Sequence, residues 1–144
     1  IGTLTKLRQL DLYANAFTGT IPTELSHPTS LEYLDLSSNS LSGGIPSELG
    51  LLTDLHRLYL DDNSLTGLIP SAIGTLTKLR QLDLYANAFT GTIPTELSHP
   101  TSLEYLDLSS NSLSGGIPSE LGLLTDLHRL YLDDNSLTGL IPSA

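Results

Sequence analysis

The sequence predicts an α/β solenoid, in which short coils of chain stack on one another around a shared apolar interior. Two observations predict this fold class. Residues 73–144 repeat residues 1–72 without a substitution, and each 72-residue block divides into three similar segments of 24 residues. Periods of about 20 to 50 residues are typical of stacked repeat architectures. We therefore expect one solenoid over 1–144, with coils at 1–24, 25–48, 49–72, 73–96, 97–120 and 121–144.

Each segment is expected to contain one short strand. Leu10 and Leu12 recur at the same place in every segment and are two residues apart. On a strand they share one face, and Asp11 between them points to the other face. The apolar positions of a segment are too irregularly spaced for a helix throughout, but they suffice to line the inside of a coil. In the first segment these positions are Ile1, Leu4, Leu7, Leu10, Leu12, Phe17 and Ile21.

The residues after each strand predict a turn that is repeated from coil to coil. An asparagine stands at this place in every segment, and its amide can both donate to and accept from unpaired backbone groups of neighbouring coils. Gly19 then supplies a positive φ or room for a close turn, and Pro22 fixes an extended return. We interpret the asparagines as structural residues; they are Asn15, Asn39, Asn63, Asn87, Asn111 and Asn135.

These fixed positions carry a family resemblance. The segment from Leu31 to Glu48 follows the pattern LxxLxLxxNxLxGxIPxx, which resembles the plant-type leucine-rich repeat and recurs six times over the whole chain. The resemblance implies a right-handed solenoid with a parallel sheet on the concave face and short 3₁₀ or extended segments on the convex face. It also implies a protein- or peptide-recognition module that binds through the concave sheet, in an extracellular receptor or inhibitor.

Composition excludes several other functions. The chain has 6 Lys and Arg against 16 Asp and Glu, a net charge of −10, which would repel a nucleic acid backbone. It has no cysteine, so it can form no disulfide, thiolate metal site or cysteine nucleophile. No apolar run approaches the ~20 residues of a membrane-spanning helix. We expect neither a cofactor nor a nucleic acid partner.

Rows of side chains on the concave sheet can be read by stepping 24 residues. One row alternates Arg8, Glu32 and His56, whose charges largely compensate. In the next row, which includes Tyr33, Arg57, Tyr105 and Arg129, a guanidinium can lie on a phenol ring, for example that of Arg57 on Tyr33. The remaining rows are rich in acids and tyrosines, and all of these residues are expected to face the solvent. The candidate ligand-binding residues are Asp35, Tyr59, Asp61, Asp62, Asp83, Tyr85, Asp107 and Tyr131.

Such a surface favours a protein or peptide that carries basic groups, because tyrosines supply contact area and acids steer cationic partners. The alternative interpretation is a solvated polar face without a ligand. Asp11 beside Asp35 could in principle act as an acid–base pair, but a smooth sheet has no pocket that excludes water, so we predict no enzymatic activity. Asp61 and Asp62 follow no known metal-binding loop, and we predict no metal site.

Two other functions remain open. Rows of hydroxyls on the convex side, such as Thr18, Ser42 and Thr66, could order water as an ice-binding surface. The identity of the two 72-residue halves fits either a very recent natural duplication or engineering. An engineered chain would be an idealised scaffold with no natural ligand.

The two outer coils of a solenoid each expose one apolar face. The family resemblance implies cysteine-paired flanking modules that cover such faces, and residues 1–144 contain none. We therefore expect the chain either to associate end to end with further copies or to lie within a longer protein.

Overall fold

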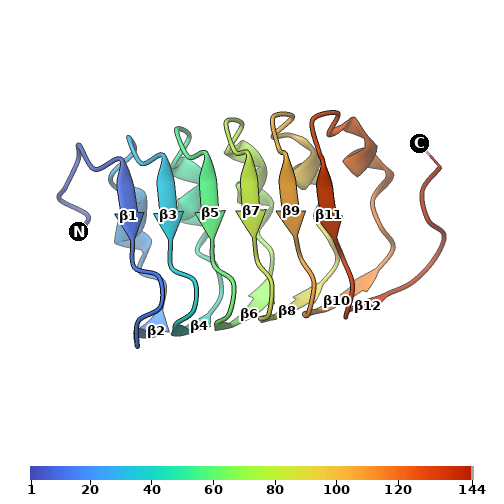
Figure 1. The fold of residues 1–144 in the computed structure, drawn as a ribbon, viewed down its shortest axis with the longest axis horizontal. Helices are drawn as coiled ribbons and strands as arrows, with labels where there is room; N and C mark the ends of the chain where they lie inside the picture. Colours follow the sequence, from blue (N-terminus) through green and yellow to red (C-terminus); the bar gives the residue numbers. More distant parts are fainter. Residues whose placement is uncertain (144) are drawn as a thin grey trace.

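The computed structural model describes residues 1–143 and is a right-handed solenoid, in which each coil contributes strands and a short 3₁₀ helix (Figure 1). Parallel strands of successive coils form the concave sheet, in the order β1-β3-β5-β7-β9-β11. This arrangement confirms the predicted α/β solenoid. The strands of the concave sheet are β1 (Gln9–Asp11), β3 (Tyr33–Asp35), β5 (Arg57–Tyr59), β7 (Gln81–Asp83), β9 (Tyr105–Asp107) and β11 (Arg129–Tyr131).

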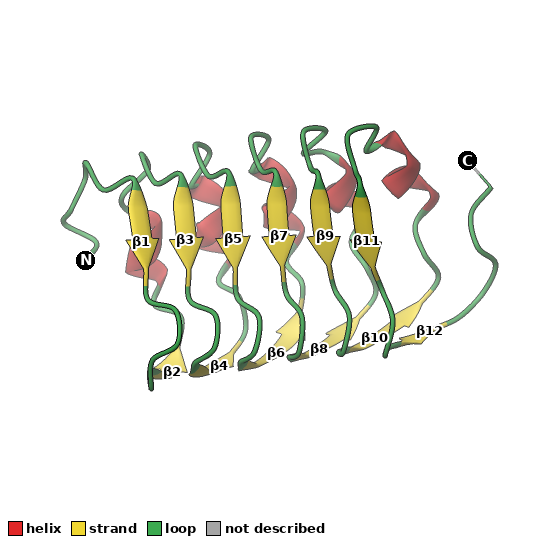
Figure 2. Ribbon diagram, viewed as in Figure 1, coloured by secondary structure: helices red, strands yellow, loops and turns green. Residues whose placement is uncertain are grey.

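A second parallel sheet and five 3₁₀ helices complete the coils of the described chain (Figure 2). The second sheet contains β2 (Thr18–Thr20), β4 (Ser40–Gly43), β6 (Ser64–Leu68), β8 (Ala88–Gly91), β10 (Ser112–Gly115) and β12 (Ser136–Leu137). The helices are η1 (Thr23–Ser26), η2 (Ser47–Leu51), η3 (Ser71–Thr75), η4 (Thr95–Ser98) and η5 (Ser119–Leu123). Each helix follows a proline in extended conformation, which ends the preceding extended segment.

The core is one continuous column of leucine and isoleucine side chains, together with Phe89, between the two sheets and the 3₁₀ helices. Leu58 on β5 and Leu60 directly after it are both fully buried, as are Leu82 on β7 and Leu84 directly after it. Asp83 between the last two points to the concave surface, as the two-residue alternation of a strand requires. The concave surface is therefore built from the residues that flank the buried leucines.

The asparagines after the strands connect neighbouring coils by hydrogen bonds. The Asn39 Nδ2 donates to the carbonyl oxygens of Leu12 (3.0 Å) and Leu36 (3.1 Å), and its Oδ1 accepts from the Phe17 N–H (3.0 Å). One side chain thus ties its own coil to the preceding one. The equivalent bonds to the preceding coil recur at Asn63, Asn87, Asn111 and Asn135.

The turns and the second sheet show two features that the sequence did not indicate. The hydroxyl row of Thr18 and Ser42 does not follow the second sheet, because Thr18 stands opposite Ser40 and Ser42 stands opposite Ser64. Residues 24 apart are therefore not directly opposed in this sheet, in contrast to the concave sheet. The residue before each asparagine has a left-handed φ between 50° and 53° although none is glycine; these residues are Ala14, Ser38, Asp62, Ala86, Ser110 and Asp134.

Candidate ligand-binding face

The rows on the concave sheet are in register from coil to coil. Gln9, Tyr33, Arg57 and Gln81 stand opposite one another along the sheet, and the same 24-residue step continues to Arg129. Neighbouring strands lie about 4.8 Å apart, so side chains of one row contact each other directly. The sequence rows are therefore spatial rows.

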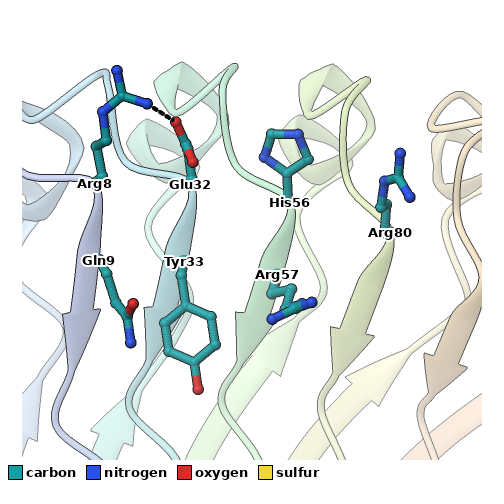
Figure 3. Close-up of a pocket in the computed structure, with 7 residues that line it drawn as sticks. All are labelled: Arg8, Gln9, Glu32, Tyr33, His56, Arg57 and Arg80. Atoms are coloured by element: carbon teal, nitrogen blue, oxygen red, sulfur yellow. Dashed lines mark hydrogen bonds and ion pairs between the residues drawn. The ribbon is translucent and has the colours of Figure 1, made fainter.

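The row of Arg8, Glu32 and His56, directly before the strands, contains ion pairs. The Arg8 Nη1 lies 2.7 Å from the Glu32 Oε1, and the Arg80 Nη1 lies 3.1 Å from the Glu104 Oε1. This confirms the charge compensation expected for the row. Arg8, Glu32 and Arg80 border a hollow of about 420 Å³. Figure 3 shows the residues that line this hollow, with the ion pair of Arg8 and Glu32 drawn as a dashed line; they are Arg8, Gln9, Glu32, Tyr33, His56, Arg57 and Arg80.

The tyrosines meet each other, and the expected stacking of Arg57 on Tyr33 is wrong. The Tyr33 side chain points away from Glu32 (Figure 3), and its ring meets the Tyr59 ring edge to face with 5.7 Å between centroids. Tyr105 and Tyr131 form the second such pair, at 5.8 Å. The Tyr33 hydroxyl donates to the Asp35 carboxylate at 2.9 Å, which turns the ring toward the acidic rows instead of toward Arg57.

Two of the candidate acids are buried, contrary to the expectation that they face the solvent. Asp35 and Asp107 are each 8% exposed. The Asp35 carboxylate accepts hydrogen bonds from the Ser37 N–H (3.0 Å), the Ser37 hydroxyl (2.5 Å) and the Tyr33 hydroxyl. Asp107 makes the same contacts one 72-residue block later. These carboxylates hold the tyrosine rings and the strand ends in place.

Asp35 and three further aspartates line a shallow hollow of about 340 Å³ on the concave sheet. Asp61 and Asp83 are half-buried there. Asp11 stands opposite Asp35 on the neighbouring strand, as the 24-residue step predicts. We call this hollow the acidic hollow; it is lined by Asp11, Tyr13, Tyr33, Asp35, Ser37, Tyr59, Asp61 and Asp83.

The structure gathers four of the eight candidate residues in the acidic hollow: Asp35, Tyr59, Asp61 and Asp83. Tyr85 lies beside it with 40% of its surface exposed, and Asp62 lies in the turn below the sheet with an exposed side chain. Asp107 and Tyr131 belong to later coils and line the next part of the face. The candidate list omitted Tyr33, although its position two residues before Asp35 on the same strand face could have indicated the contact.

Burial and neighbouring charge raise the pKa of two carboxyl groups in the acidic hollow. Burial, and then the nearby Asp83 carboxylate, raise the pKa of Asp61 to about 7 from an ordinary 3.8. Burial also raises the pKa of Asp83, with a further contribution from Asp107. The three ion pairs of the described chain lie elsewhere, so no cation of residues 1–143 pairs with these carboxylates.

The raised pKa of Asp61 predicts how stability changes with pH. Because the folded chain holds the Asp61 proton more tightly than the unfolded chain, its stabilising contribution is complete below about pH 4. This contribution is lost as the pH rises through 7. We expect Asp61→Asn to be more stable than the wild type at pH 8 and to have a flatter stability profile between pH 4 and 7.

Urea unfolding at a series of pH values measures this effect. Asp133→Asn is the matched control, because Asp133 has the same sequence neighbours as Asp61 but is exposed in the last coil. Equal pH profiles for the two variants would contradict the assignment of the effect to burial in the hollow.

No group of three or more His, Asp or Glu side chains is arranged to hold a metal ion within residues 1–143. Over the same residues, no helix has the length and apolar character needed to cross a membrane. Every buried side-chain nitrogen and oxygen in this range has a hydrogen-bond partner.

Comparison with known proteins identifies leucine-rich repeats along the chain. Leucine-rich repeat family profiles match residues 53–113 and residues 6–28, 30–52 and 126–144. A search of curated protein sequences gives no significant match.

Several solved structures are similar over almost the whole chain. The ectodomain of the Arabidopsis thaliana membrane receptor kinase GASSHO1/SCHENGEN3, in complex with CASPARIAN STRIP INTEGRITY FACTOR 2, is 45% identical with a TM-score of 0.97. The match covers 98% of this chain and 17% of that one. The plant peptide hormone receptor RGFR1, in complex with RGF2, is 41% identical with a TM-score of 0.97, and the match covers 99% and 23% of the two chains.

The present chain thus spans less than a quarter of the length of these two receptors. A chain of the Arabidopsis thaliana BIR3–SERK2 complex is closer in length: it is 40% identical with a TM-score of 0.82, over 93% of this chain and 71% of that one. The repeats, the fold and these matches agree, and the chain belongs to the leucine-rich repeat family.

Proposed function

We propose that the chain is a non-enzymatic recognition module that binds a basic peptide, or a basic segment of a protein, on its concave sheet. The acidic hollow is the observation that carries this proposal. It contains four carboxylates and three tyrosines on an open surface. We further propose that residues 1–144 act as one unit of six coils, with Asp62, Tyr85, Asp107 and Tyr131 extending the contact area beyond the hollow.

The electrostatics of the hollow favour a cationic ligand. Asp61 and Asp83 are half-buried and lie close enough to raise each other's energy when charged. A lysine or arginine side chain of a ligand would offset the repulsion between the two carboxylates. Its hydrogen bonds to them would also replace the hydrogen bonds to water that they lose on burial. Asp35 has a different role, because its carboxylate already accepts three hydrogen bonds and positions Tyr33.

The relatives support a peptide ligand and an extracellular setting. RGFR1 is a peptide hormone receptor, and the receptor kinase HAESA, 37% identical to this chain, was solved with the peptide hormone IDA and the co-receptor SERK1. Both are several times longer than the present chain. We therefore propose the class of ligand and the extracellular location by analogy, and we do not transfer any individual hormone.

Binding to two synthetic peptide libraries tests the proposal. The first contains ten-residue peptides with lysine or arginine at fixed positions, and the second has glutamate at the same positions. We expect wild-type protein at pH 8 to retain the basic peptides only. Asp61→Asn should weaken that binding at least about tenfold, since a charge-assisted hydrogen bond contributes about 1.5–3 kcal/mol.

Asp133→Asn is the control with the same change in net charge and the same sequence context. It should bind the basic library like the wild type. Equal losses in both variants would mean that only overall charge matters. Retention of neither library by the wild type would contradict the proposal and favour a scaffold without a natural ligand.

A further inference from the structure

The second sheet has an outward surface that consists almost entirely of hydroxyl side chains. On β4, β6, β8 and β10 one residue is buried in the core; these are Leu41, Leu65, Phe89 and Leu113. The residues on either side of the buried one point outward, because side chains alternate along a strand. On β4, β6 and β10 both of them are serine or threonine, and on β8 they are Ala88 and Thr90. We call these outward residues the hydroxyl face.

The hydroxyls of this face repeat in two directions. Across the strands, Thr20 on β2 stands opposite Ser42, and Ser42 stands opposite Ser64, at the strand spacing of about 4.8 Å. Along β6, Ser64 and Thr66 are about 6.6 Å apart, since a parallel strand rises about 3.3 Å per residue. Opposed residues are 22 positions apart, two fewer than the repeat, and two residues are one period of a strand. The hydroxyls of successive coils therefore stay on one side of the sheet.

These hydroxyls are available to water. Within residues 1–143, two hydroxyls of the face donate to a protein acceptor: Thr90 to the Gly67 carbonyl oxygen and Ser114 to the Gly91 carbonyl oxygen, each at 3.4 Å. Both bonds are weak, because an O–H···O bond is usually about 2.5–3.0 Å long. The central hydroxyls, such as those of Ser64 and Thr66, can bond to solvent.

The hydroxyl face carries no charge in the described chain. The residues of β2, β4, β6, β8, β10 and β12 include no charged side chain, although the sequence has 16 Asp and Glu and 6 Lys and Arg. Aromatic and arginine side chains, which dominate contacts between proteins, do not point outward from these strands either. The one large side chain that β4, β6, β8 and β10 expose is Leu68, which lies over Gly91 of the next coil. The face is therefore an uncharged array of small groups and is poorly suited to a protein partner.

We propose that the hydroxyl face binds the surface of ice. Oxygen atoms in an ice crystal repeat at fixed distances in two directions, so a fixed array of hydroxyls with comparable spacings holds a layer of water in lattice positions. Water that bridges several protein groups is well ordered. Charged side chains would orient water around themselves instead, and the face has none in the described chain.

This function depends neither on the chain termini nor on the acidic hollow. β4, β6, β8 and β10 each have a paired strand on both sides. The second sheet runs along the base of the solenoid in Figure 2, whereas the acidic hollow lies on the concave strands. Adsorption to ice and peptide binding therefore use different residues and are measured separately.

The growth of ice crystals in a frozen solution tests the proposal. Just below the melting point, crystals should stay smaller with the wild type than in buffer alone, and the freezing point should fall below the melting point. Thr66→Lys places a long, charged side chain in the middle of the face, so both effects should be lost. Ser112→Lys, at an exposed serine on β10, should give the same loss.

Thr77→Lys is the matched control, because Thr77 is an exposed threonine outside the second sheet and the net charge changes equally. It should retain both effects of the wild type. Far-ultraviolet circular dichroism verifies that all three variants are folded. Equal losses in Thr66→Lys and Thr77→Lys would overturn the proposal, as would crystals that grow with the wild type as they do in buffer.

Uptake into growing ice measures the binding itself. When ice grows slowly from a dilute solution of fluorescently labelled protein, the wild type should enter the ice and Thr66→Lys should remain in the liquid. Asp61→Asn, which should lose binding of basic peptides, should enter the ice like the wild type. Exclusion of the wild type from the ice would contradict this proposal and would leave the proposed peptide binding unaffected.

Discussion

Replacing Phe89 with alanine is expected to lower the free energy of unfolding by about 3–5 kcal/mol, the range for a fully buried phenylalanine. The Phe89 side chain is 0% exposed and lies on β8, which pairs with β6 of the preceding coil and β10 of the following coil. Its loss leaves a cavity that two coils share. Because each coil of a solenoid is stabilised mainly by its neighbours, the substitution should weaken the packing of this coil against the coils before and after it.

Phe17→Ala is the matched control for this prediction. Phe17 has the same sequence neighbours as Phe89 from Ile1 onward, but it is 45% exposed because residues 1–24 have no preceding coil in the structure. Its replacement should cost about 1 kcal/mol. Urea unfolding followed by circular dichroism compares the two variants, and equal losses of stability would contradict the packing described for β8.

The fold could be predicted because the 24-residue period fixes most of the geometry. Leucines at alternate positions define the buried side of each strand, and the period then places Gln9 opposite Tyr33 and Asp11 opposite Asp35. The ion pair between Arg8 and Glu32 follows from the same step. A row is a property of the repeat, and the repeat can be read directly from the sequence.

Contacts between rows could not be predicted in the same way. The edge-to-face contact of Tyr33 and Tyr59 joins different rows, and it depends on the rotamers that the Asp35 carboxylate selects. The burial of Asp35 follows from these contacts, although its place in the repeat is the same as that of the exposed Asp11. In the second sheet, opposed residues such as Thr18 and Ser40 are 22 residues apart in the sequence. A sequence that repeats every 24 residues does not indicate this register.

Identical residues also differ according to their place in the stack. Asp61 and Asp133 share their sequence neighbours, yet Asp61 is half-buried between coils and Asp133 is exposed at the end. Local sequence cannot distinguish them, because burial in a solenoid is determined by the adjacent coils. The duplication therefore provides internal controls in which only the stacking environment changes.

The asparagine after β7 gives the second large effect. We expect Asn87→Ala to lower the free energy of unfolding by about 3 kcal/mol, because a buried N–H or C=O left without a partner costs about 1–3 kcal/mol. The Asn87 Nδ2 donates to the Leu60 carbonyl oxygen at 3.0 Å, and its Oδ1 accepts from the Leu65 N–H at 2.9 Å. Alanine can replace neither bond, and Leu65 is fully buried, so water cannot replace the second one.

Asn15→Ala should cost less than about 1 kcal/mol, because Asn15 is exposed and bonds only within its own coil. Urea unfolding of the two variants under identical conditions measures the difference, and similar values would mean that the bonds between coils contribute little. The comparison also bears on recognition. The Asn87 Nδ2 donates to the Tyr85 carbonyl oxygen at 3.2 Å, and the same oxygen accepts a hydrogen bond from the Asp62 N–H. These bonds fix the backbone that positions the side chains of Asp62 and Tyr85, which are both candidate ligand contacts.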